Sequence, residues 1–187
     1  MIRNDALPSK LTLYLRRFFY YLTNERCGKK INYDWNKTLN RFDIINKLIK
    51  NKKFKTYLEI GCQSDVNFSK IQIENKVGVD PQSGGTHRMT SDEFFSQNKN
   101  MYDLIFIDGL HIHEQVLKDI DNSLHFLNEN GIILLHDCLP AKIWHQTIPQ
   151  THSSWNGDVW KSIVQSRTRE DIDTYTIKAD QGLGLIL

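Results

Sequence analysis

Four short apolar runs constrain the fold of this chain more than any other feature of its sequence. They cover residues 57–60 (YLEI), 76–79 (KVGV), 102–107 (YDLIFI) and 132–135 (IILL), and each is followed at once by Gly, Asp or His-Asp. Continuous runs of leucine and β-branched residues are typical of strands that are buried on both faces of a parallel sheet. Because polar and helical segments separate these runs, the pattern predicts a doubly wound α/β domain.

Amphipathic segments flank the four runs. Apolar residues recur at helical spacing in residues 41–50, 114–127 and 155–167, and each of these segments is predicted to be a helix. Residues 174–179 alternate like a strand, and residues 182–187 form a second apolar strand after a tight turn. Such a pair predicts a hairpin, so the sheet should end in an antiparallel strand.

The N-terminal part is basic and contains one strongly apolar helix. Residues 9–23 (SKLTLYLRRFFYYLT) predict a helix. Its broad apolar surface must pack against the main domain, a second subunit or lipid. Docking onto the domain is the expected outcome, and a homodimer through this helix is an alternative. Residues 1–55 hold 14 Lys and Arg against 4 Asp and Glu, and the rest holds 10 against 18. This asymmetry indicates either a basic segment docked on an acidic domain or an anionic partner, such as a phosphorylated carrier or a membrane surface.

Composition excludes several classes of protein. Cys27, Cys62 and Cys138 are odd in number and form no C-x-x-C pair, which disfavours a disulfide framework or a zinc knuckle and predicts a reducing, cytoplasmic location. No run of 18 apolar residues occurs, so no membrane span is expected. The basic segment matches no nucleic-acid-binding motif, so no nucleic acid is expected as a partner.

A glycine and an acid at successive strand ends indicate a nucleoside-containing ligand. Gly61 follows the first run and Asp80 follows the second, where an acid is placed to accept hydrogen bonds from two ribose hydroxyls. A dinucleotide site would need G-x-G-x-x-G, but Gln63 and Asp65 occupy the turn, and an aspartate would repel a pyrophosphate. The sulfonium of S-adenosylmethionine (SAM) tolerates acidic neighbours such as Glu59 and Asp65.

Taken together, the segments YLEIGCQSD, VGVDP, TSDEFF, YDLIFIDGLHIHEQV, GIILLHDCLP and WNGDVWKSI resemble the class I SAM-dependent methyltransferases. The similarity is greatest to methyltransferase family 24, which is related to catechol O-methyltransferase. It runs from about Arg41 to the C-terminus and implies a Rossmann-like, mostly parallel, seven-stranded sheet whose last strand is antiparallel. It divides the chain into an N-terminal helical extension, residues 1–40, and a methyltransferase domain, residues 41–187.

The resemblance also implies a cofactor site. Glu59 and Gly61 match the family's acidic-glycine motif near the methionine moiety, and Asp80 matches the acid that binds ribose. Ser91 and Asp92 fall in the loop that contacts adenine, although Ser91 as a helix cap is an equally good interpretation. The cofactor-binding residues expected on this basis are Glu59, Gly61, Asp80, Ser91, Asp92 and Asp108, the last lying beside the reacting centre.

Methyl transfer to a hydroxyl group requires removal of the hydroxyl proton, and the sequence offers two mechanisms for this step. Metal-dependent relatives hold a divalent cation with aspartates that Asp108 and Asp137 match, but Cys138 stands where asparagine is expected. A thiol is a poor ligand for Mg²⁺, so Mn²⁺, Fe²⁺, Zn²⁺ or no ion is equally admissible. The alternative is a histidine base, with His111 as first choice and His136 beside Asp137 on the next strand. The catalytic residues expected are therefore His111, His136 and Asp137.

The sequence thus predicts a SAM-dependent methyltransferase that modifies a hydroxyl of a small-molecule or sugar-like acceptor. The long segment 139–156 is expected to be a lid or a binding element. A degenerate, non-catalytic SAM-binding domain is the main alternative, because Asp65 and Cys138 depart from the family pattern. A nucleotide-dependent oxidoreductase is disfavoured by the missing glycine fingerprint.

Overall fold

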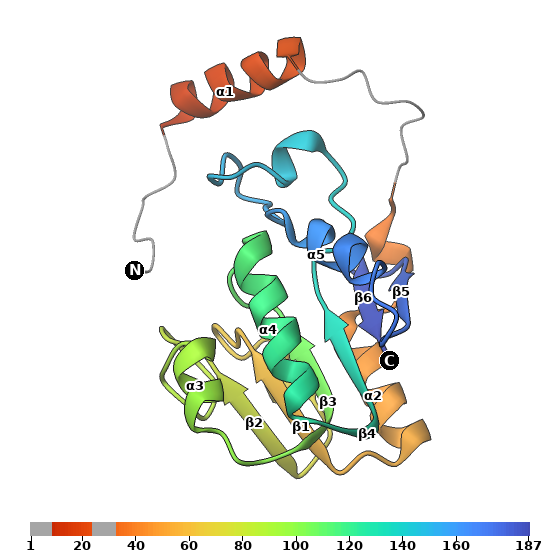
Figure 1. The fold of residues 1–187 in the computed structure, drawn as a ribbon. Coiled ribbons are helices and arrows are strands. Elements are labelled where there is room, and N and C mark those ends of the chain that lie inside the picture. Colours follow the sequence, from red (N-terminus) through yellow and green to blue (C-terminus); the bar gives the residue numbers. More distant parts are fainter. Residues whose placement is uncertain (1–8, 24–32) are drawn as a thin grey trace.

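The computed structural model describes residues 9–23 and 33–187, which form one α/β sheet domain and a separate N-terminal helix (Figure 1). Within these residues the sheet has six strands, in the order β2-β1-β3-β4-β6-β5. The strands are β1 (Thr56–Ile60), β2 (Asn75–Val79), β3 (Tyr102–Ile107), β4 (Leu127–Leu135), β5 (Thr174–Ile177) and β6 (Leu183–Ile186).

The sheet confirms the predicted doubly wound topology with a C-terminal hairpin. Strands β2, β1, β3 and β4 are parallel neighbours, and β6 pairs antiparallel with both β4 and β5. The four apolar runs are the four parallel strands. Their carboxyl ends therefore meet at one edge of the sheet, where the expected site residues follow.

The expectation of seven strands is wrong for the part of the chain that the structure describes. Only residues 80–90 connect β2 to the next helix, and a parallel crossover needs a dozen or more residues before a further strand can form. A single parallel bridge between Val79 and His87 occupies the edge where a seventh strand would pair. The connection is too short to build the strand.

Helices cover both faces of the sheet (Figure 1). Helix α2 (Arg41–Lys52) packs Ile45 and Ile49 on one face, and helices α3 (Ser91–Gln97), α4 (His113–His125) and α5 (Val159–Ser166) cover the other. Side chains alternate between the two cores along each strand: Leu104 and Phe106 face α2, whereas Ile105 and Ile107 face α4. Three short 3₁₀ helices lie in the connections: η1 (Trp35–Lys37), η2 (Phe68–Lys70) and η3 (Ile143–His145).

The predicted N-terminal helix forms as α1 (Lys10–Thr23) and lies against η3. The expectation that its apolar surface docks onto the domain is wrong, because large apolar side chains of α1 such as Phe18 remain more than half exposed. The division of the chain at residue 40 stays a prediction, although helix α2 begins at Arg41 with Asn40 as its N-cap.

No helix in the described ranges is both long and apolar enough to cross a bilayer. Cys62 and Cys138 are buried free thiols, and Cys27 lies outside the described residues. Between these two buried thiols there is thus no disulfide.

Candidate active site

Two aspartates and two histidines converge at the carboxyl ends of β3 and β4. Asp108 follows β3, and His111 lies three residues further on. His136 and Asp137 follow β4. His111 Nε2 lies 3.3 Å from Asp108 Oδ1, and its Nδ1 lies 3.2 Å from Asp137 Oδ2. His136 Nδ1 lies 3.3 Å from Asp108 Oδ1 and 3.2 Å from Asp137 Oδ1. The geometry brings together all three residues expected to be catalytic.

Arg41 and Asp180 complete this cluster and were not expected from the sequence. Arg41 is the first residue of α2, and Asp180 lies in the turn between β5 and β6. The Arg41 guanidinium lies 2.8 Å from His136 Nε2, 3.6 Å from Asp180 and 3.8 Å from Asp108. The Arg41 backbone N–H also donates to Asp180 Oδ2 at 2.7 Å. No local sequence signal marks these residues, since their partners lie about 45 to 140 positions away in the chain.

The segment after β4 closes over the cluster, as expected for a binding element. The Asn156 side-chain amide donates to Asp137 Oδ1 at 2.6 Å and to Gln181 Oε1 at 3.3 Å. The ring of Trp155 stacks on His111 with 5.4 Å between centroids, and its carbonyl oxygen lies 3.2 Å from His111 Nδ1. Asn156 is buried, and its Oδ1 has no hydrogen-bond partner among the described residues. Asn156 and Trp155 thus position Asp137 and His111.

Burial and the neighbouring groups shift the pKa values of this cluster in opposite directions. Burial alone would raise the pKa of Asp108, but the hydrogen bonds from His111 and His136 hold it well below its usual range. Burial alone would lower the pKa of His111, but its hydrogen bond to Asp108 and the charge of Asp137 raise it above its ordinary value. The carboxylates of Asp108 and Asp137 likewise hold the pKa of His136 well above normal against burial.

Arg41 selects the protonation state of His136. A guanidinium can only donate, so its 2.8 Å contact requires an unprotonated Nε2 and leaves the ring proton on Nδ1, between the two carboxylates. A proton on Nε2 would instead face Asp180 Oδ1, 3.6 Å away. With Arg41 in place the geometry favours neutral His136, even though the carboxylates raise its pKa. His111 has a carboxylate oxygen near each ring nitrogen, and it is the better holder of a proton.

Three residues of the cluster can hold a metal ion. Asp108, His111 and Asp137 each offer one ligand atom, and these atoms lie within 4.8 Å of one another. Two carboxylates and one imidazole suit Mn²⁺, Fe²⁺ or Zn²⁺ as well as harder ions. Cys138 does not contribute, because its Sγ lies buried against the carbonyls of residues 135 and 136, and burial raises the pKa of its thiol to about 12. The residues present fit a divalent cation.

The end of β1 brings the backbone close to this cluster. Gly61 has a φ of +91°, and a Cβ built there would lie 2.2 Å from the Asp108 carbonyl oxygen. Glu59 is buried and accepts hydrogen bonds from the Tyr57 hydroxyl at 2.6 Å and the Asn67 amide at 2.8 Å. Burial raises the pKa of Glu59 to about 7, against the effect of those two hydrogen bonds. The predicted glycine is therefore required by close approach, and Glu59 forms part of a buried polar network.

Asp80 lies at the end of β2, as predicted, but its carboxylate is already engaged. Its Oδ2 accepts from the Gln63 N–H at 2.9 Å, and its Oδ1 accepts from the N–H groups of Gln82 and Ser83 at 2.7 and 2.9 Å. A carboxylate offers about four acceptor positions, so one remains. The side chain is buried and fixes the loops that follow β1 and β2 to each other.

Ser91 and Asp92 begin helix α3 and contact α4. Gln115 donates to Ser91 Oγ at 3.3 Å and to Asp92 Oδ1 at 3.1 Å, and Lys118 pairs with Asp92 at 2.6 Å. The interpretation of Ser91 as the helix cap is wrong: the N-cap is Thr90, in a capping box with Glu93. The described contacts of Ser91 and Asp92 tie two helices together.

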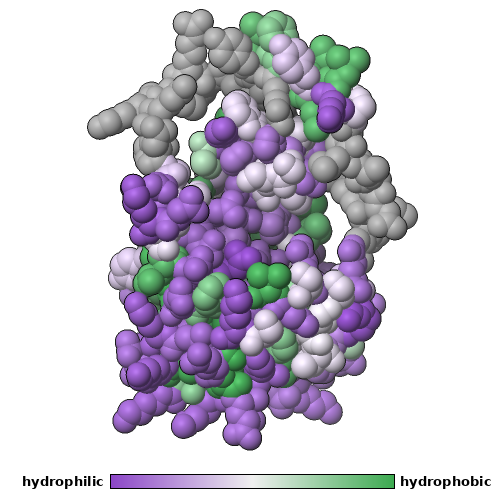
Figure 2. Space-filling model, turned by 180° about the vertical axis from the view of Figure 1, so that it is seen from behind, coloured by the Kyte–Doolittle hydropathy of each residue, from purple (hydrophilic) through white to green (hydrophobic). Residues whose placement is uncertain are grey.

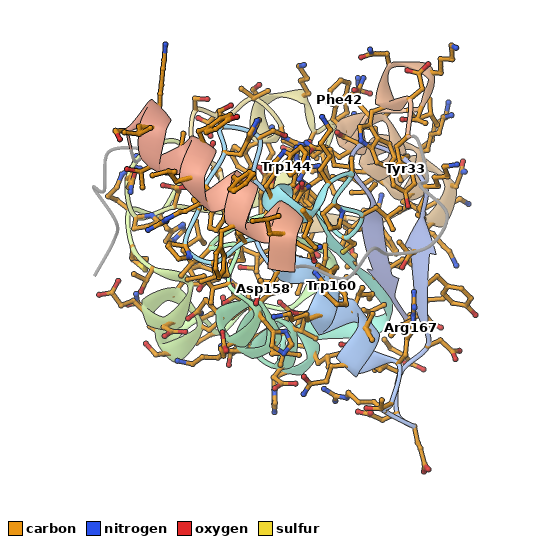
Figure 3. All side chains as sticks on the ribbon, turned by 90° about the horizontal axis from the view of Figure 1, so that it is seen from above. Tyr33, Phe42, Trp144, Asp158, Trp160 and Arg167 are labelled. Carbon is orange, nitrogen blue, oxygen red and sulfur yellow. The ribbon has the colours of Figure 1, made fainter. Side chains whose placement is uncertain are left out.

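A cavity of about 230 Å³ begins at Cys138, the residue that follows Asp137. Tyr33, Trp160 and Arg167, labelled in Figure 3, line it together with apolar side chains of α5. The buried Trp160 indole N–H finds no acceptor within the described residues, and the Arg167 guanidinium donates to Thr176 at 2.7 Å. The cavity therefore combines aromatic walls with one charged donor, the Arg167 guanidinium.

Comparison with known protein families agrees with this architecture. The family model of methyltransferase family 24, described as a methyltransferase domain, matches residues 58–138, which include β1 to β4 and the aspartates at the ends of β3 and β4. The resemblance to methyltransferase family 24 is confirmed. No curated protein matches the chain.

Solved structures share the fold of this domain at low sequence identity. The S-adenosylhomocysteine (SAH)-bound methyltransferase PaMTH1 of Podospora anserina has 16% identity and a TM-score of 0.60, over 93% of this chain and 86% of that one. An O-methyltransferase from Bacillus cereus in complex with SAH has 11% identity and a TM-score of 0.58, over 97% and 92%. The O-methyltransferase TomG from Streptomyces achromogenes, in complex with SAM, has 10% identity and a TM-score of 0.59, over 93% and 95%. These likenesses show a class I methyltransferase fold.

Proposed function

We propose that this protein is a SAM-dependent methyltransferase that modifies a hydroxyl group of a small-molecule or sugar-like acceptor. The observation that carries the proposal is the convergence of Asp108, His111 and Asp137 next to the end of β1, where Gly61 brings two strands close together. A base thus lies beside the position at which class I folds bind a nucleoside, outside the carboxyl ends of the strands.

Three of the expected residues would hold SAM. Asp80 keeps one acceptor position for a ribose hydroxyl, and a second ribose contact requires one of the Gln82 or Ser83 N–H groups to give way. Gly61 has no side chain to obstruct a ligand at the end of β1, and Glu59 lies directly before that turn. SAH or SAM in the structures of similar fold supports the same cofactor here. Ser91 and Asp92 would reach adenine only from the start of α3.

Bound SAM would supply an electrophilic methyl group on its sulfonium sulfur. The acceptor oxygen would form the new C–O bond as the S–C bond breaks, and the sulfur would keep the electron pair, giving SAH. His111 would take the hydroxyl proton, and the Asp108 and Asp137 carboxylates would stabilise the resulting imidazolium. Asp137 and Trp155 hold the ring in place, and Arg41 keeps His136 neutral beside it.

A divalent cation at Asp108, His111 and Asp137 is the second form of this proposal. The three carboxylates of Asp108, Asp137 and Asp180 and the single Arg41 guanidinium leave two negative charges in the cluster, which one divalent cation would offset. An ion held there would orient and acidify an acceptor hydroxyl, and His136 would lie beside it as the histidine that is not a ligand.

The cavity that begins at Cys138 suits the acceptor. Tyr33 and Trp160 offer flat apolar surfaces of the kind that pack against sugar or aromatic rings, and the Arg167 guanidinium offers hydrogen bonds. Its volume of about 230 Å³ favours a small molecule over a polymer chain.

The test begins with calorimetric titration of SAH and of NAD, followed by turnover of SAM with a panel of sugar and phenol acceptors. Binding of SAH, no binding of NAD, and methylation of a hydroxyl are the expected results. His111→Ala should slow turnover by roughly 10²–10⁴-fold and leave SAH affinity nearly unchanged. His125→Ala, on the exposed end of α4, is the matched control and should keep full activity.

A chelator separates the two forms of the proposal. If histidine alone acts, EDTA leaves turnover unchanged; if a metal acts, EDTA abolishes turnover and added Mn²⁺ restores it. Binding of SAH without turnover of any acceptor would instead support the non-catalytic SAM-binding domain. Absence of SAH binding would refute both.

A further inference from the structure

Helix α1 presents a continuous apolar stripe to solvent. Leu11, Tyr14, Leu15, Phe18 and Leu22 recur at spacings of three and four residues and are each between 53% and 68% exposed. Figure 2 shows apolar side chains gathered over this helix at the top of the molecule, above a largely hydrophilic surface. An exposed apolar stripe of this length marks an interaction surface.

The orientation of α1 follows from which side chains are covered. Thr12, Leu13 and Arg16 are half-buried, and they lie on the side of the helix opposite Phe18. The helix rests against η3, in the segment that carries Trp144, and Figure 3 shows it crossing above that residue. The domain therefore covers the less apolar side of α1 and leaves the more apolar side outward.

The charge of α1 indicates what covers this stripe. The helix contains Lys10, Arg16 and Arg17 and no acidic residue, within an N-terminal part that is itself strongly basic. Two copies of α1 side by side would place two basic helices together, with no carboxylate on either one. An anionic surface would offset the same charges, so charge complementarity favours such a surface over a second copy.

The length of α1 excludes a membrane span and suits an interfacial position. Its 14 residues extend about 21 Å, less than the roughly 30 Å hydrocarbon core of a bilayer. Helices with an apolar face, a basic remainder and aromatic residues lie in the plane of the membrane interface. Tyr14 and Phe18 are the aromatic groups of the stripe.

We propose that α1 binds the protein peripherally to anionic lipid membranes, with Leu11, Tyr14, Leu15, Phe18 and Leu22 inserted and the exposed Lys10, which flanks this stripe, at the headgroups. Bound in this way, the membrane lies on the side of α1 opposite η3. The proposal does not depend on methyl transfer, and it holds whether or not the domain is catalytic.

The test is co-sedimentation of the full chain with vesicles of phosphatidylcholine alone or with 30% phosphatidylglycerol. Each basic residue near an anionic surface contributes about a factor of five, so Lys10 by itself predicts about fivefold stronger partition into the anionic vesicles at low salt. Screening at 500 mM NaCl should remove most of that difference. Leu15→Glu with Phe18→Glu should weaken binding at least tenfold. Tyr175→Glu, on an equally exposed aromatic residue of β5, should not change it.

Three results would overturn the proposal. One is partition that is absent or equal for both lipid compositions. Another is equal loss of binding in the Tyr175 control. The third is a dimer, seen by light scattering, that the α1 variant converts to a monomer without any vesicle binding, which would assign the stripe to a second copy of the chain. Circular dichroism and a thermal melt establish that each variant is folded.

Discussion

Replacing Gly61 by alanine tests the claim that the close approach of β1 and β3 builds the site. Gly61 has a φ of +91°, which side chains other than glycine rarely adopt. An added Cβ would lie 2.2 Å from the Asp108 carbonyl oxygen and 2.6 Å from the Gly109 Cα. Both are backbone atoms, so no side-chain rotation can relieve the contact.

The cost can be worked out from three contributions. The backbone conformation costs an alanine about 1–2 kcal/mol. Moving the Cβ about 1 Å away from the carbonyl oxygen resembles overpacking of a core, at about 1–3 kcal/mol. The shift also weakens two flanking backbone hydrogen bonds of 2.8 Å, from Gly61 to Val79 and from Asp108 to Ile60, at about 1 kcal/mol between them. We expect Gly61→Ala to lower the free energy of unfolding by about 3–6 kcal/mol.

The assay is urea unfolding followed by circular dichroism, with a thermal melt alongside. For a chain of this size the loss corresponds to a fall in Tm of roughly 10–20 °C. Gly109→Ala is the matched control. It lies at the end of the neighbouring strand, where an added Cβ would meet only a movable methyl group of Ile60, at 3.2 Å. Its cost should stay below about 1.5 kcal/mol.

Equal stabilities of Gly61→Ala and Gly109→Ala, within about 1 kcal/mol, would refute this reasoning. Such a result would mean that β1 and β3 separate at little cost. The close approach would then not be what positions Asp108 beside the cofactor end of the sheet.

Three further predictions concern the polar residues around the site. Asp80→Asn should weaken SAH binding at least tenfold in calorimetry, because it removes the charge from the ribose contact; unchanged affinity would contradict that role. Stability should fall as pH rises from about 4.5 through 7, because the folded-state pKa of Glu59 is raised to about 7 and its favoured form is the protonated one. The raised pKa of His111 should extend this loss of stability above pH 6.5. In urea titrations, Glu59→Gln should remove the contribution between about pH 4.5 and 7 and leave the contribution of His111 in place. Asn156→Ala should cost about 1.5–3 kcal/mol in urea unfolding, because it removes the 2.6 Å hydrogen bond to buried Asp137; a loss below 0.5 kcal/mol would contradict it.

Local pattern was sufficient to predict the sheet and the residues at its edge. A run such as IILL predicts a buried strand, because a strand that is covered on both faces is mostly apolar. Parallel strands bring their carboxyl ends to one edge, so Asp108 and Asp137 could be placed together without a structure. The family resemblance implies a seventh strand. That strand does not form within the described residues, because residues 80–90 are too short to build it.

Only the tertiary structure shows how the site is completed and which way α1 faces. Arg41 and Asp180 reach His136 from a helix start and a hairpin turn, and Asn156 reaches Asp137 from a long connection. Such contacts depend on where the chain returns in space, and spacing along the sequence carries no record of it. In the same way, the sequence of α1 shows that one side is apolar, but which side the domain covers is decided by the packing of that helix against η3.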